Sequence, residues 1–185
     1  MYAGILTFLV LIAAALGTVI WAVGVSNKFR AMLVKIREAD SGIDVALTKR
    51  FDTLTKLMDV VKAFAGHESG LVTETIQLRA GMGTEEKAEA SRRMDTAARQ
   101  LHVVAEAYPA LRSSENYKQL QAAVRETEDH LQGARRVYNS NVSFYNQAIA
   151  RFPASIAAGS RYTAQPFFEA DPAKRGDVKM FGEAQ

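Results

Sequence analysis

The chain has 185 residues and a formal net charge of +3, from 23 Lys and Arg against 20 Asp and Glu. Because the balance is close and the pairs 92–93 and 135–136 are isolated basic pairs in mixed-charge stretches, nucleic-acid binding is not expected. The absence of cysteine excludes disulfides, thiol catalysis and thiolate metal sites.

The first 25 residues carry no charged side chain. At about 1.5 Å per helical residue, the stretch 3–25 is long enough to cross a hydrocarbon core about 30 Å thick. A cleaved signal peptide is the alternative interpretation, but no basic residue precedes the stretch, and it exceeds the usual apolar signal core of about 7–15 residues. We therefore expect residues 1–25 to form a single-pass transmembrane anchor.

Basic side chains lie on only one side of this stretch, at Lys28, Arg30, Lys35 and Arg37. By the positive-inside rule, the body is expected in the cytoplasm and the amino terminus outside. Each of these side chains would be attracted to anionic headgroups by about 1 kcal/mol, so membrane lipid is an expected partner.

A 4-3 spacing of side chains runs unbroken from residue 27 to residue 65 and predicts one long helix. No proline interrupts it, so the helix can continue directly from the anchor, and any bend is expected at residues 24–27. The stripe is apolar except at Asp40 and Arg50. A buried charge is costly unless it is paired, so we expect both to find partners on other helices and to fix the register.

Two further helices are predicted before residue 109. Residues 71–78 indicate a short helix or a continuation of the first one. Thr84 is the expected N-cap of the next helix, with Glu85 and Glu86 in the first turn, where the helix dipole favours acids. Pro109 is expected to end this helix.

The last predicted helix begins after Ser113 or Ser114 and keeps the 4-3 spacing from residue 117 to residue 152. Thr127 and Asn141 are polar positions on its seam.

Near its end the helix repeats a Tyr-Asn pair at residues 138–139 and 145–146. Tyr138, Tyr145 and Phe152 share one heptad position, which favours packing over a catalytic or ligand-reading surface. We expect Asn139 and Asn146 to bond across to another helix and fix its register.

No segment shows sustained two-residue alternation, so no sheet is expected. Half-apolar helices must bury their stripes against each other. The predicted fold is all-α: a single transmembrane helix (1–25), a long antiparallel (four-)helix bundle (26–152) and an irregular C-terminal tail (153–185) with an apolar cluster at 166–168.

No stretch has the pattern of a catalytic or metal site. Di-metal bundles need Glu-x-x-His, which is absent, and the adjacent His67 and Glu68 lack the second histidine of a zinc-protease motif. Glu126 and His130 could share a metal, although solvated neighbours are the ordinary interpretation. We therefore expect no enzyme, no cofactor and no metal.

Large apolar residues are adjacent in the sequence at 57–58, 103–104 and 144–145, which indicates more apolar surface than one helical seam can bury. Neighbours on a helix lie about 100° apart, so one narrow seam cannot bury both. A broad core accounts for some of them, and a self-association surface could account for the rest.

Two blocks of the sequence resemble the LemA family: "IDVALTKRFDTLTKLMDVVKAFAGHE" (43–68) and "EAYPALRSSENYKQLQ" (106–121), followed by the two Tyr-Asn pairs and "FFE" (167–169). The matching motif residues are Ile43, Asp44, Arg50, Asp52, Val61, Lys62, His67, Glu68, Glu106, Tyr108, Pro109, Glu128, Arg135, Tyr138, Asn139, Tyr145, Asn146 and Pro153. The chain departs from the family at 53–58, which lacks a usual proline, and at 26–27, where the family commonly has Tyr-Asn.

The resemblance implies a membrane-anchored antiparallel helical bundle without known catalytic activity. Our leading hypothesis is a scaffold of the bacterial inner membrane that self-associates into a homo-oligomer; the alternative is an adaptor that recruits a membrane enzyme such as a protease. The expected structural or interaction residues are Asp40, Asp44, Arg50, Asp52, His67, Glu68, Tyr108, Glu128, Arg135, Tyr138, Asn139, Asn141, Tyr145 and Asn146.

Overall fold

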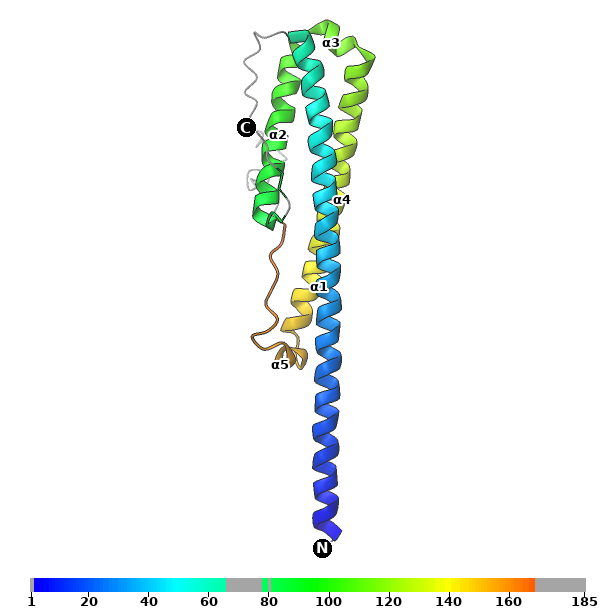
Figure 1. The fold of residues 1–185 in the computed structure, drawn as a ribbon, viewed down its shortest axis with the longest axis vertical. Coiled ribbons are helices and arrows are strands. Elements are labelled where there is room, and N and C mark those ends of the chain that lie inside the picture. The colour runs from blue at the N-terminus through cyan, green and yellow to red at the C-terminus, as the bar shows by residue number, and fades with distance from the viewer. Residues whose placement is uncertain (1, 66–77, 80, 169–185) are drawn as a thin grey trace, which may run out of the picture. The chain divides into compact units, whose positions relative to one another are not determined.

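The computed structural model describes residues 2–65, 78–79 and 81–168, and this part of the chain contains helices and no strand (Figure 1). The helices are α1 (Tyr2–Ala65), α2 (Thr84–Glu106), α3 (Pro109–Ser113), α4 (Glu115–Ala150) and α5 (Ala154–Ala158). The all-α prediction is confirmed. The short helix expected at 71–78 lies outside the described residues, apart from residue 78, so the count of four bundle helices stays a prediction.

Helix α1 runs without a break through residues 24–27, so the expected bend is not there (Figure 1). Its N-terminal part is apolar, and no residue of the most apolar stretch is buried against the rest of the chain. By length and composition, α1 can cross a membrane.

The helix ends lie where the capping residues and prolines predict them, except that the cap of α2 is one residue earlier than expected. The cap of α2 is Gly83 rather than Thr84: the Gly83 N–H donates to the Glu86 carboxylate at 2.9 Å, and Thr84 is the first helical residue. Ser114 caps α4 as expected, because its Oγ accepts from the Tyr117 N–H at 3.3 Å. Pro109 occupies the first position of α3, where its missing N–H costs nothing.

Helix α4 ends at Ala150, so the predicted heptad stripe loses its third member. Tyr138 and Tyr145 are buried, but Phe152 is 76% exposed. The cause is Pro153, because a residue before proline is pushed out of the helical region. The following segment is more ordered than the predicted irregular tail, since it forms α5 and continues to a buried Phe168.

The chain divides into two units, and α1 and α4 contribute to both. Unit 1 comprises residues 1–40 and 137–166, and unit 2 comprises residues 41–136 and 167–185. In unit 1 the core side chains come from α1, α4 and the segment after α4: Phe29, Ile36, Ala39, Tyr138, Val142, Tyr145, Ala158 and Tyr162. In unit 2 they include Ile43, Leu47, Leu54, Leu57, Val61, Met94, Leu101, Leu111, Leu131 and Phe168.

Ion pairs in unit 2 join α1 to α4 and to α2. Lys49 pairs with Glu126 at 3.1 Å and Arg50 with Glu128 at 2.8 Å, so α1 and α4 approach each other there, and Figure 1 shows them running in opposite directions. Asp44 pairs with Lys87 and Arg50 with Asp95, so α1 and α2 run in the same direction. The prediction of an antiparallel four-helix bundle stays a prediction, because residues 66–77, which hold the helix expected between α1 and α2, lie outside the described residues.

Candidate functional site

The interior of unit 2 holds a charged cluster centred on Arg50, whose exposed fraction is only 3%. Its Nη2 atom lies 2.5 Å from Asp95 Oδ1 and 2.8 Å from Glu128 Oε2. Its Nη1 donates to Ser91 Oγ at 3.2 Å. One guanidinium on α1 therefore hydrogen-bonds to two side chains of α2 and forms an ion pair with one of α4, which confirms that Arg50 finds partners on other helices.

Arg135 on α4 extends the cluster. It donates to the same Ser91 Oγ, and its guanidinium lies over the Phe168 ring, 4.7 Å from the centroid. Burial lowers the pKa of Arg135, whereas the charges of Glu128 and Asp95 oppose that shift. Two arginines and two carboxylates balance in formal charge, which lets the cluster sit in an interior. The cation–π contact ties the segment after α5 to it.

Beside this cluster, Lys87 is buried on α2 and its Nζ lies 2.7 Å from Asp44 Oδ1 on α1. The Asp44 carboxylate is about half exposed, so the lysine stem is covered while its charged end reaches a partner near water. Lys87, Ser91 and Asp95 are spaced four residues apart, which places all three on one face of α2.

That face is not among the predicted site residues, because the helix was predicted from its apolar side chains alone. Phe168 was noted only as part of an apolar cluster. The four-residue spacing of Lys87, Ser91 and Asp95 was the available signal.

In unit 1, the Tyr-Asn repeat holds the segment after α5. The Tyr138 hydroxyl donates to the Pro166 carbonyl at 3.1 Å. Asn146 makes a paired contact with the backbone of Gln165: its Nδ2 donates to the carbonyl at 2.9 Å, and its Oδ1 accepts from the N–H at 2.8 Å. The expectation that Asn146 bonds across to another helix is wrong, because the backbone of an extended segment is its partner.

Helix-to-helix bonding through an amide occurs at Asn141 instead. Its Nδ2 donates to the Lys35 carbonyl on α1 at 3.2 Å. Next to it, Tyr145 is 1% exposed, and burial raises the pKa of its hydroxyl.

The other predicted residues within the described ranges lie at separate positions along the helices. Asp40 and Asn139 are half-buried, and Asp52 is exposed. Tyr108 is half-buried, and its carbonyl accepts from the Arg112 N–H at 3.2 Å in α3. His67 and Glu68 lie outside the described residues.

The contacts in both units join helices and hold a chain segment in place. Among the described residues, no three His, Asp or Glu side chains gather closely enough to hold a metal ion. Glu126, considered with His130 as a metal pair, is bonded to Lys49.

These features define a class of protein: an all-α chain whose N-terminal helix can cross a membrane and whose helices are joined by a buried ion cluster. The sequence model of the LemA family matches residues 39–180, more than three quarters of the chain. The chain belongs to the LemA family. Comparison with curated proteins gave no match.

Proposed function

We propose that the chain is a membrane-anchored helical scaffold of the bacterial inner membrane that self-associates and carries out no catalytic step. The observation that carries this proposal is the continuity of α1. The same helix contains the exposed apolar stretch and the buried residues Phe29 and Ile36, which pack in unit 1. A stretch of this length with its whole surface exposed is stabilised by hydrocarbon rather than water.

The proposed orientation places the chain that follows residue 25 on the cytoplasmic side and the amino terminus outside, because the basic residues 28, 30, 35 and 37 follow the apolar stretch. The chain has no cysteine, so introduced thiols report location cleanly. With the outer layer of the cells made permeable, an impermeant thiol reagent should label Tyr2→Cys and leave Ser160→Cys unlabelled until lysis. Both positions are exposed in the structure. Labelling of position 160 alone would reverse the assignment.

Exposed apolar side chains at one end of unit 2 support self-association. The pairs 44–87 and 50–95 align α1 with α2 at an offset of about 43–45 residues, so Phe64 lies at the level of residues 107–109. Val103, a little over one turn earlier on α2, is also exposed, whereas its neighbour Val104 is half-buried. The same end therefore presents Phe64 and Val103 to solvent, and we take them as the self-association surface.

Light scattering of the full-length chain in mild detergent at micromolar concentration tests this. The wild type should be larger than a monomer, and Phe64→Ser/Val103→Ser should shift it toward monomer with unchanged helicity. Val45→Ser is the control, since Val45 is equally exposed on α1 but far along the helix from Phe64. A monomeric wild type would contradict self-association. If crosslinking then captured one stable heterologous membrane enzyme, the adaptor hypothesis would replace the scaffold.

A further inference from the structure

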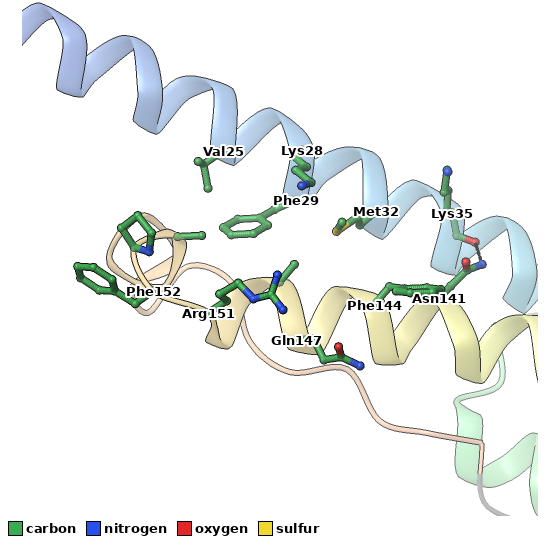
Figure 2. Close-up of a pocket in the computed structure, with 13 residues that line it drawn as sticks. Val25, Lys28, Phe29, Met32, Lys35, Asn141, Phe144, Gln147, Arg151 and Phe152 are labelled. Carbon is green, nitrogen blue, oxygen red and sulfur yellow. Dashed lines mark hydrogen bonds between the residues drawn. The ribbon is translucent and has the colours of Figure 1, made fainter.

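Unit 1 contains a cavity of about 640 Å³ between α1 and α4, beginning where the charge-free stretch of α1 ends (Figure 2). Its lining runs from Val25 to Lys35 on α1 and from Asn141 to Ala148 on α4, and residues 151–154 close one end. This volume is within the range of about 300–1,000 Å³ typical of small-molecule sites.

The walls of the cavity are largely apolar and partly open to solvent. Phe29 is buried, whereas Phe144 is 63% exposed and Phe152, as noted above, is more exposed still. Large aromatic surface left in water is unfavourable, and a hydrocarbon chain at the Val25 end of the cavity would cover part of Phe152.

Cations are placed at the same cavity. Lys28 on α1 and Arg151 just after α4 line it, and no acidic residue is among the described residues that do so. Within the described ranges, neither Lys28 nor Arg151 has an ion-pair partner. Lys35 differs, because Figure 2 shows its ammonium group directed away from α4, while its carbonyl accepts from Asn141. The cavity therefore combines apolar walls with two cations that have no acidic neighbour among the described residues lining it.

Lys28 lies about as far beyond the apolar stretch as a lipid headgroup lies beyond the hydrocarbon core. Lys28 follows Val25 by three residues, or about 4.5 Å along a helix. A polar headgroup layer extends about 5–8 Å beyond the hydrocarbon core on each side. If residues 3–25 fill the core, as the anchoring proposed above requires, Lys28 lies at the level of the lipid phosphates.

We propose that this cavity binds one anionic phospholipid, with its phosphate between Lys28 and Arg151 and an acyl chain against Val25 and Phe152, at the end of the cavity nearer the charge-free stretch of α1. Two cations facing one phosphate favour a lipid of net negative charge over a zwitterionic one, whose own cationic group would meet them. The apolar walls favour a whole lipid over a free phosphate.

Native mass spectrometry of the full-length chain tests the proposal, with equimolar phosphatidylglycerol and phosphatidylcholine of identical acyl chains in mild detergent. The wild type should retain one phosphatidylglycerol, at least tenfold over phosphatidylcholine. Lys28→Gln/Arg151→Gln should lose that preference. The matched control, Arg30→Gln/Arg37→Gln, removes the same charge from exposed positions of α1 that do not line the cavity, and its preference should stay within twofold of the wild type.

Several results would overturn the proposal. If the wild type retains the two lipids equally, the proposal is overturned before any variant is measured. If both double variants lose the preference equally, the lipid is attracted to the basic segment in general. Displacement of the lipid by millimolar glycerol phosphate would indicate a free-anion site. A lipid-free dimer would indicate that a second copy covers the cavity. Extraction of the wild type from membranes by alkaline carbonate would reject the anchor as well, whereas the other outcomes leave the anchor standing.

Discussion

Replacing Arg50 with methionine is expected to lower the free energy of unfolding by about 3 kcal/mol. The substitution leaves Asp95 and Glu128 facing each other without the guanidinium that joins them at 2.5 and 2.8 Å. Removing one member of a buried pair costs about 3–5 kcal/mol, and we place the effect at the lower end because 28% of the Glu128 side chain is still exposed. Urea unfolding of the full-length chain in mild detergent, followed by circular dichroism, measures the change.

Lys49→Met is the matched control, because it removes the same charge from the neighbouring residue. The Lys49–Glu126 pair lies on the surface, with both side chains more than half exposed, so its loss is expected to cost less than about 1 kcal/mol. Equal effects of the two substitutions would show that the buried cluster contributes no more than an ordinary surface ion pair.

Replacing Tyr145 with alanine is expected to lower the free energy of unfolding by about 3–5 kcal/mol, the usual effect of truncating a large buried aromatic residue. Tyr145 is the largest fully buried side chain in the described part of the chain. Its removal leaves a void beside Val142 and removes apolar contacts between α4 and its neighbours in unit 1.

Phe144→Ala is the control for Tyr145→Ala, since it truncates an adjacent ring of similar size on the exposed side of α4. Phe144→Ala should change the free energy of unfolding by no more than about 0.5 kcal/mol. The two thermal transitions can be compared directly. A large loss for Phe144→Ala with little change for Tyr145→Ala would mean that α4 is rotated relative to this structure.

The period of the sequence predicted the helices well, because burial along a helix repeats every three to four residues whatever the helix packs against. The period could not identify which side chains on other helices a given residue contacts. Arg50 was expected to be paired, but its acids lie 45 and 78 positions further along the chain, on helices whose order in space no local pattern encodes. The direction of α2 relative to α1 is likewise encoded by no local pattern.

The Tyr-Asn repeat shows a second limit of structure prediction from residue spacing. The repeat correctly predicted that Tyr138 and Tyr145 are buried, because a heptad spacing keeps both on one face. The same spacing was extended to Phe152, where the backbone preference before Pro153 overrides it. Nothing in the spacing could show that Asn146 bonds to the backbone of Gln165, since that partner lies beyond the helix.

The contact between Asn146 and Gln165 has a consequence for how freely these two positions can vary during evolution. Asn146 bonds to the N–H and carbonyl of residue 165, so it recognises the main chain and not the glutamine side chain. Position 165 can then accept almost any residue except proline, which has no N–H to donate. Position 146 needs a side chain that donates and accepts at this reach, so the asparagine is constrained although its partner's identity is not.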